Sequence, residues 1–272
     1  MTEALANPAG QPARIELRSV SKSFPTRAGD RLALDDISLR VAAGETATVI
    51  GPTGCGKTTV LNLVAGFTLP TTGEVLAAGL PVSAPGPDRG FMFQRPNLLP
   101  WLTIAENVAF PCRHGRIGGA TRSRAEIADA AAHYLESVGL HDAQKLFPHQ
   151  LSGGMQSRAA LARLLIADSS ILLMDEPFAA LDAQTRLSMQ QLLRRVVKTD
   201  GTRTVLFITH DVEEALLISD HVFLMSAAPG RLLRQVSVPF RGDENYRDIV
   251  MRPEFNDLKH ELIDQLERLV PA

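Results

Sequence analysis

Polar and apolar positions alternate along the first part of the chain. The alternation has a period of two over residues 15–20, 32–34 and 37–41, which predicts half-buried β-strands. Residues 25–30 are expected to turn the chain between these strands. The strands are expected to form a small antiparallel sheet. Residues 1–13, which contain prolines and a glycine, are expected to form a disordered lead-in.

Further along, unbroken apolar runs alternate with helical patterns. The runs predict buried strands at residues 46–50, 90–94, 170–174 and 204–208, and a hairpin at 221–225 and 232–238. Apolar residues at helical spacing predict helices at residues 60–65, 123–138, 158–165, 184–198, 212–218 and 253–270. Strands that alternate with helices are typical of an α/β fold.

Between the predicted strands at residues 90–94 and 170–174, the chain has a stretch with helical periodicity and no predicted strand. This pattern over residues 103–145 predicts a separate α-helical subdomain, placed at about residues 95–158. Ser123 and Glu126 have the spacing of a capping box at the start of its helix 123–138. The last residues, 241–272, are expected to form a helical extension of the main domain.

One loop between a predicted strand and a predicted helix fits the G-x-x-x-x-G-K-[ST] pattern at every fixed position. It consists of Gly51, Pro52, Thr53, Gly54, Cys55, Gly56, Lys57, Thr58 and Thr59. Its glycines let successive backbone N–H groups point at one phosphate, and the helix N-terminus adds partial positive charge. Lys57 can reach the β- and γ-phosphates, and the Thr58 hydroxyl can ligate Mg²⁺. The loop is predicted to bind a nucleoside triphosphate.

Polar residues follow three of the other predicted strands. Asp175 and Glu176 end the strand 170–174, where Asp175 can hold Mg²⁺ and Glu176 can polarise a water for attack on the γ-phosphate. His210 follows the strand 204–208, where it can contact the γ-phosphate or the water, and we favour this function over a structural role. Gln94, which ends the strand 90–94, is either functional or an ordinary strand terminus.

A second helix start is suited to an anion. Ser152, Gly153 and Gly154 precede the helix 158–165, and Ser152 can cap it while the glycines leave its N–H groups open. The phosphate loop already accounts for one triphosphate. This second start is therefore idle, binds another ligand or completes a site across a dimer.

Composition narrows the class of protein. Of 272 residues, 45% are hydrophobic and 21% charged, as in globular proteins, and the net charge of −2 gives no basic field for nucleic acid. The two cysteines, Cys55 and Cys112, form no C-x-x-C pair, which favours a reducing compartment. Neither a secretory signal nor an apolar run of membrane-spanning length is recognisable, so a cytoplasmic location is expected.

Together these motifs resemble the ATP-binding subunit of ABC transporters over residues 15–240. The resemblance implies a P-loop NTPase (RecA-like) core with an antiparallel β subdomain and an inserted α-helical subdomain, binding ATP and Mg²⁺. Residues 51–59 match the Walker A loop, residues 171–175 match Walker B, and Glu176 matches the catalytic glutamate. The other matches are Phe24 with the aromatic that stacks on adenine, Gln94 with the Q-loop glutamine and a metal contact, residues 151–155 with the signature, Asp182 with the D-loop, and His210 with the switch histidine.

The resemblance also implies partners. Two subunits, expected to be a homodimer, would pack head to tail, so that Ser152, Gly153 and Gly154 of one close on the γ-phosphate held by the other. A separate transmembrane permease would contact the apolar loop around Trp101, and an extracytoplasmic solute-binding protein would act through it. The subunit would lie at the cytoplasmic face of the membrane.

Within the family, residues 98–103, Met155 and residues 176–182 look most like importers of nitrate, sulfonates, taurine and related compounds. The sequence departs from the common pattern at Gln156-Ser157, next to the dimer contact, and at Arg95, next to the permease contact. A soluble ABC ATPase acting on nucleic acid or ribosomes is the alternative. The single cassette and near-neutral charge disfavour it. An exporter would differ mainly in its permease.

Overall fold

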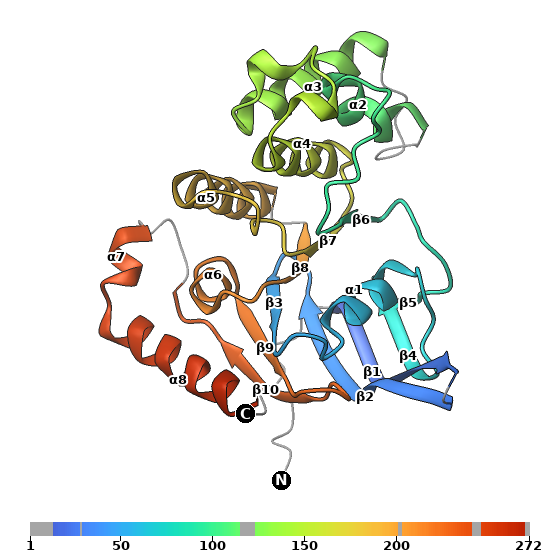
Figure 1. Ribbon diagram of the computed structural model, residues 1–272, viewed down its shortest axis with the longest axis vertical. Helices are drawn as coiled ribbons and strands as arrows, with labels where there is room; N and C mark the ends of the chain where they lie inside the picture. The colour runs from blue at the N-terminus through green and yellow to red at the C-terminus, as the bar shows by residue number, and fades with distance from the viewer. Residues whose placement is uncertain (1–12, 28, 115–122, 201–202, 241–245, 270–272) are drawn as a thin grey trace. The chain divides into compact units, whose positions relative to one another are not determined.

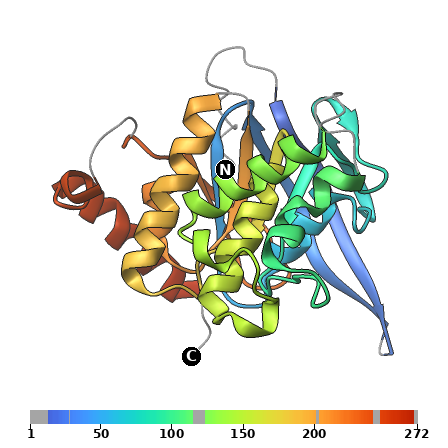
Figure 2. The same cartoon turned by 90° about the horizontal axis from the view of Figure 1, so that it is seen from above.

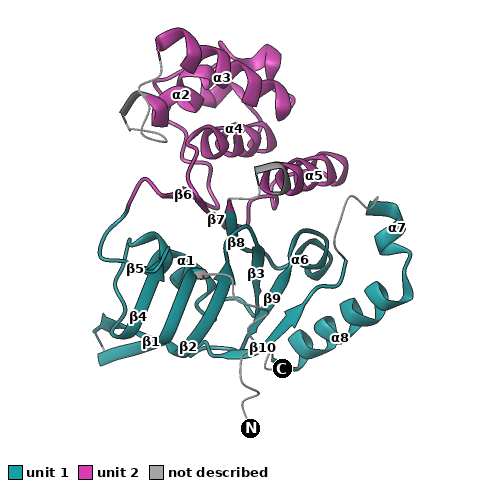
Figure 3. Ribbon diagram, turned by 180° about the vertical axis from the view of Figure 1, so that it is seen from behind, with its two compact units in different colours: residues 1–85, 204–272 teal, residues 86–203 magenta. Residues whose placement is uncertain are grey.

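The computed structural model describes residues 13–27, 29–114, 123–200, 203–240 and 246–269. All but the last residue of the expected lead-in 1–13 lie outside this described part. The chain forms two compact units, here called unit 1 (residues 1–85 and 204–272) and unit 2 (residues 86–203) (Figure 3).

Unit 1 contains an antiparallel sheet with the strand order β2-β1-β4-β5. Its strands are β1 (Ala13–Thr26), β2 (Gly29–Ala42), β4 (Thr72–Ala77) and β5 (Leu80–Pro81). The period-two pattern works as predicted, because alternate residues such as Ile15, Leu17 and Leu39 are buried. The long ribbon of β1 and β2 is visible in blue in Figures 1 and 2.

The predicted turn at residues 25–30 is too long. The ladder between β1 and β2 continues to the pair Thr26 and Gly29. The ladder contains irregular positions that do not end it. Ser19 and Asp36 have φ angles of 45° and 50°, and the register shifts between Leu17 and Val20. Such bulges bend a ribbon without ending it, which a period-two pattern does not reveal.

Unit 1 also contains strands in the order β10-β9-β3-β8, of which β9, β3 and β8 are parallel and β10 is antiparallel to β9. The strands are β3 (Thr46–Ile50), β8 (Thr204–Ile208), β9 (His221–Met225) and β10 (Leu232–Ser237). β3 pairs in parallel with β8 and β9, and β10 closes the predicted hairpin with β9. Every residue of β3, β8 and β9 is buried, which explains their unbroken apolar runs.

Four helices lie in the described residues of unit 1. They are α1 (Lys57–Ala65), α6 (Val212–Ile218), α7 (Tyr246–Val250) and α8 (Pro253–Leu269). α8 buries Phe255 and Leu262, and the Phe255 ring lies edge-on to Phe240 with centroids 5.4 Å apart. An ion pair between Arg234 of β10 and Glu261 also fastens α8. The predicted C-terminal helix is thus packed onto unit 1.

The described residues of unit 2 contain a parallel strand pair and the helices α2 to α5. The pair is β6 (Arg89–Met92) with β7 (Ile171–Asp175), and the helices are α2 (Ile104–His114), α3 (Arg124–Ser137), α4 (Gly153–Ile166) and α5 (Ala183–Asp200). The capping box of Ser123 and Glu126 is confirmed at the start of α3. The strand predicted at 90–94 is displaced, because the β6 ladder ends at Met92 and Gln94 lies beyond it.

Candidate functional site

The phosphate loop lies between β3 and α1 in unit 1, as the sequence predicts. Gly54 and Gly56 have φ angles of 79° and 101°, in the left-handed region that favours glycine. A Cβ at Gly56 would lie 2.6 Å from the Leu34 side chain, so this position also lacks room for one. Lys57 Nζ donates to the Gly51 and Pro52 carbonyl oxygens, at 2.7 and 2.9 Å. The ammonium is therefore held over the loop.

The start of α1 is prepared for an anion. No acidic residue stands in its first turn, and Gly56 caps it without a side chain that could occupy the N–H groups. Thr58 is exposed in this turn, where its hydroxyl is an oxygen donor of the kind that Mg²⁺ prefers. Cys55 is buried under the loop, and this burial raises the pKa of its thiol despite the nearby Lys57. The thiol is therefore kept neutral at physiological pH.

The turn between β9 and β10 packs against the backbone of the phosphate loop. Gly230 N donates to the Ala33 oxygen and Asp35 N to the Gly230 oxygen, both at 2.9 Å. A Cβ at Gly230 would lie only 2.1 Å from the Cys55 carbonyl oxygen, so the two backbones are in close contact. No motif in the sequence indicates this support. The glycine in Ala227–Gly230 reads as an ordinary hairpin residue.

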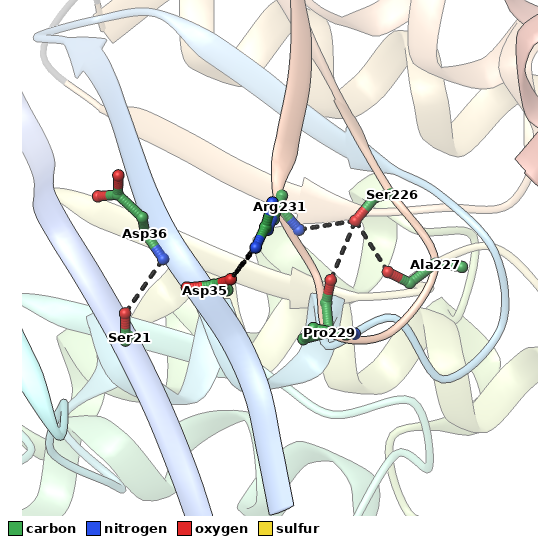
Figure 4. A network of polar contacts seen from close by, with 7 residues as sticks. All are labelled: Ser21, Asp35, Asp36, Ser226, Ala227, Pro229 and Arg231. Atoms are coloured by element: carbon green, nitrogen blue, oxygen red, sulfur yellow. Dashed lines mark hydrogen bonds and ion pairs between the residues drawn. The ribbon is translucent and has the colours of Figure 1, made fainter.

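Polar contacts hold this turn to β2 (Figure 4). Arg231 Nε donates to Asp35 Oδ2 at 2.9 Å, and the Arg231 backbone N–H donates to Ser226 Oγ at 2.9 Å. The Ser226 hydroxyl is within donating distance of the Ala227 and Pro229 oxygens. On the other side of β2, Asp36 N donates to Ser21 Oγ of β1 at 3.1 Å. The turn is thereby tied to the antiparallel sheet.

Phe24 lies near the end of β1 with 39% of its surface exposed. Lys22 Nζ lies 5.0 Å from the centre of its ring, in a cation–π geometry, and donates to the Leu69 oxygen at 2.7 Å. The sequence analysis named the ring and missed the lysine. A ring that is fixed in place but exposed is suited to stacking on a flat base.

His210 stands between β8 and α6, and its side chain is exposed. The next residue, Asp211, caps α6, because its Oδ1 accepts from the backbone N–H groups of Glu213 and Glu214 at 2.9 and 3.2 Å. Asp211 therefore begins the helix. It also fixes the backbone that carries His210.

In unit 2 the buried strand β7 delivers its acids as predicted. Asp175 is only 9% exposed at the strand's end. Glu176 follows with a φ of 48°, an uncommon conformation for a glutamate that is found at functional sites. Gln94 Nε2 donates to Glu176 Oε2 at 3.1 Å, so the structure brings these two predicted residues together. The Asp175 carboxylate also matches the oxygen donors that Mg²⁺ prefers.

The segment after Gln94 is fastened by two side chains. Arg163 of α4 donates to the Pro96 and Asn97 oxygens at 2.9 and 3.0 Å. Asn107 of α2 is fully buried, accepts from Leu99 N at 2.7 Å and donates to the Leu99 and Leu102 oxygens at 3.0 Å. The loop that they hold presents Trp101, which is 70% exposed. Neither anchor was singled out from the sequence.

The second anion-ready helix start is present at α4. Ser152 caps it, with its Oγ accepting from Met155 N at 3.3 Å, and no acidic residue stands in the first turn. A Cβ at Gly153 would meet nothing within 4 Å, so this face of the turn is open. A Cβ at Gly154 would lie 3.3 Å from the Ala180 carbonyl oxygen, which places the turn against the residues before α5.

Gln156, one of the departures from the family pattern, has a structural role here. Its Nε2 donates to the Pro148 and Leu151 oxygens at 2.9 and 3.3 Å, which fixes the chain just before Ser152. Asp182 caps the start of α5, where its Oδ1 accepts from Thr185 N at 3.0 Å. The bonds from Thr185 lower the pKa of the Asp182 carboxyl, so it stays ionised.

The predicted residues are therefore divided between the units. Phe24, residues 51–59 and His210 belong to unit 1, whereas Gln94, Asp175, Glu176, Ser152 and Asp182 belong to unit 2. Among the described residues there is no group of three or more His, Cys, Asp or Glu side chains that could hold a metal ion by itself. None of the described helices is both long and apolar enough to cross a membrane.

Comparison with known proteins gives one consistent family. The family model described as "ABC transporter" matches residues 34–179. The taurine import ATP-binding protein of Roseobacter denitrificans is 40% identical, with 93% of each chain covered. The nitrate import ATP-binding protein of Synechococcus elongatus is 42% identical, covering 92% of this chain and 90% of the relative. The taurine import protein of Chromobacterium violaceum is 44% identical, covering 90% and 92%.

Solved structures agree with the fold. The dimeric ATP-binding cassette MJ0796 in a post-hydrolysis state with ADP and Pi has a TM-score of 0.75 and 32% identity. The match covers 84% of this chain and 99% of that one. The predicted α/β fold of a P-loop NTPase is confirmed. This chain belongs to the ABC transporter family, as one of its ATP-binding, ATP-hydrolysing subunits.

Proposed function

We propose that the chain is the ATPase of an ABC importer for a small solute such as nitrate, a sulfonate or taurine. The observation that carries this proposal is the complete set of ATPase groups in a chain that is similar to import subunits over most of its length. The ATPase domain is inferred to span residues 15–240, with a helical subdomain at about 95–158 and an extension at 241–272. The alternative, an ATPase acting on nucleic acid or ribosomes, has no observation in its favour.

The residues of unit 1 would bind the nucleotide. The adenine stacks on Phe24, which Lys22 holds in place, and the N–H groups of residues 51–59 bind the phosphates. Lys57 supports the β- and γ-phosphates as negative charge builds up during transfer. Thr58, Asp175 and Gln94 are the residues that would hold Mg²⁺, which when bound would neutralise charge on the phosphate oxygens. His210 orients the γ-phosphate or the attacking water.

Glu176 would act as the general base. Its carboxylate accepts a proton from the water that attacks the γ-phosphate. The bond from Gln94 holds one of its oxygens, Oε2, in a fixed direction. Movement of the segment after Gln94 would therefore alter the geometry of Glu176, which connects the exposed loop around Trp101 to hydrolysis.

A second copy of the chain would complete the site. Ser152, Gly153 and Gly154 of one subunit would bind the γ-phosphate held by the other, in a head-to-tail homodimer. The open turn at Gly153 and the absence of an acid in the first turn of α4 support this arrangement. The similar cassette MJ0796 is itself dimeric with ADP and Pi. ATP would then join the subunits, and hydrolysis would release them.

A permease would bind the exposed loop around Trp101 and hold the subunit at the cytoplasmic face of the membrane, while a solute-binding protein acts from the other side. To test this, the tagged chain is purified from gently solubilised membranes and its partners are identified by mass spectrometry. We expect a polytopic membrane protein to co-purify with the wild type and to be lost from Trp101→Glu. Met251→Glu, at a residue of unit 1 that is 81% exposed, is the matched control and should retain it. Recovery of ribosomal proteins or nucleic acid instead would refute the transport function.

A further inference from the structure

Glu213, in the first turn of α6, is held by both C-terminal helices. Its Oε1 accepts from the Tyr246 hydroxyl of α7 at 2.7 Å, and its Oε2 pairs with Lys259 of α8. Burial raises the pKa of Glu213, but the bonds from Lys259 and Tyr246 outweigh burial and lower it overall. Burial and the bond to Glu213 raise the pKa of Tyr246 to about 12, so its hydroxyl keeps the proton that it donates.

The backbone of Glu213 leads directly to His210. Glu213 N donates to Asp211 Oδ1 at 2.9 Å, and Asp211 N donates to Thr209 Oγ1 at 3.1 Å. His210 lies between these bonded residues. A shift in the first turn of α6 would therefore move the backbone that carries the histidine.

Packing alone does not fix this turn against α8. A cavity of about 400 Å³ lies between them, lined by residues that include His210, Asp211, Glu213, Lys259, Leu266 and Glu267. Close packing resists movement, and at this solvent-open pocket α6 and α8 are not closely packed against each other. At this pocket Lys259 of α8 pairs with Glu213, and Tyr246 of α7 binds the other carboxylate oxygen of Glu213, so polar contacts hold the turn where packing is open.

We propose that Tyr246 and Lys259 are positioning residues, which act through Glu213 to hold the first turn of α6 and keep His210 in its catalytic position. This inference rests on the role of His210 proposed above. It gives the C-terminal extension a function in hydrolysis. The rate of the chemical step then depends on α7 and α8, although neither helix carries a motif of the family.

The test compares steady-state ATP hydrolysis of Lys259→Met, Tyr246→Phe and the double variant. We expect kcat to fall about tenfold in the double variant and about threefold in Tyr246→Phe, because small displacements of a catalytic group are costly. KM for ATP should change less than twofold, since the phosphate loop is untouched. Lys259→Arg keeps the charge and should restore most of the rate. Glu261→Gln breaks a different ion pair of α8, with Arg234, and is the matched control with wild-type kcat.

A double-mutant comparison separates positioning from general destabilisation. In a His210→Ala background, Lys259→Met should cause no further loss of kcat, because there is no histidine left to displace. An equal further loss in that background, or an equal effect of Glu261→Gln, would overturn the inference. So would an unchanged kcat in the folded Tyr246→Phe variant. If His210→Ala itself retains full activity, the proposed role of His210 fails instead.

Discussion

Single residues in this chain show how backbone conformation prepares a catalytic group. Glu176 has a φ of 48° and lies within hydrogen-bonding distance of Gln94. A left-handed conformation is unfavourable for a glutamate, so the surrounding structure must impose it. Glu176 directly follows the buried strand β7, and its carboxylate accepts the bond from Gln94. The side chain is thereby held in one direction before substrate binds.

The residues that belong to sequence motifs were predictable. The residues that hold those motif residues in place were not. Lys57, Glu176 and Ser152 follow fixed spacings that the chemistry requires, so a sequence reveals them. Gly230, Lys22 and Arg163 act through contacts with residues far away in the chain, such as Cys55 and Asn97. No local pattern marks such a contact. The bond between Gln94 and Glu176 likewise depends on the pairing of β6 with β7.

At this scale we predict that Gly230→Ala weakens ATP binding. The new Cβ would lie 2.1 Å from the Cys55 carbonyl oxygen, and neither backbone can yield without displacing the phosphate loop. We expect Kd for ATP, measured by titration with a fluorescent analogue, to rise at least about tenfold, which corresponds to about 1.4 kcal/mol.

Gly79→Ala provides the control. Gly79 also has a positive φ, of 77°, but a Cβ there would meet nothing within 4 Å. The Gly79→Ala variant should have a slightly lower thermal midpoint of unfolding and an unchanged affinity for ATP. If Gly230→Ala binds ATP as well as Gly79→Ala does, the turn between β9 and β10 does not support the phosphate loop.

At the scale of elements, unbroken apolar runs and period-two alternation predicted which segments form strands. They predicted the ends of those strands less well. Unbroken apolar runs predicted β3, β7, β8 and β9 because these strands are buried on both faces. The continuation of β1 and β2 through their irregular positions was missed, since a bulge interrupts the alternation that predicts a strand. β6 ends early because its ladder with β7 stops at Met92.

The anchoring of the loop before α2 predicts a large effect of Asn107→Leu. The carboxamide is fully buried, and it satisfies the Leu99 N–H and several backbone oxygens. Leucine of similar size leaves these groups buried and unpaired, which should lower the free energy of unfolding by about 2–4 kcal/mol. Urea unfolding of the purified chain measures this change. Asn256→Leu, at a partly exposed helical asparagine, should cost much less; equal losses would show that Asn107 is not a special anchor.

The attachment of α7 and α8 to α6 predicts a pH dependence of stability. The folded-state pKa of Glu213 lies below its ordinary value of 4.5, because the bonds from Lys259 and Tyr246 outweigh the opposing effect of burial. Its contribution to stability is therefore present above pH 4.5 and lost as pH falls through the lower, folded-state pKa.

Glu213→Gln removes this ionisation. The variant should be less stable than the wild type at neutral pH, and its stability should decline less between neutral pH and the acid range. Thermal midpoints across that range measure the difference. Parallel curves for the two proteins would mean that Glu213 does not gain its charge-dependent contacts on folding.

For the whole molecule, the order of the motifs predicted more than any single element did. Walker A, Gln94, the signature, Walker B, Asp182 and His210 occur in one sequence, and the family and fold that they indicated are confirmed. The role of the C-terminal extension was not predictable, because its contacts to Glu213 follow from tertiary packing alone. In the proposed importer the transported solute would be recognised by other chains, so no pattern for it is expected in this one.

In the proposed cycle, ATP joins two copies of this chain and Glu176 activates the water that ends this state. The most direct measurement is the mass of Glu176→Gln with and without saturating ATP, by light scattering on a sizing column. We predict a monomer of 29.5 kDa without ATP and a stable species of twice that mass with it. Lys57→Ala in the same background should stay monomeric. A Glu176→Gln chain that binds ATP but remains monomeric would contradict the account.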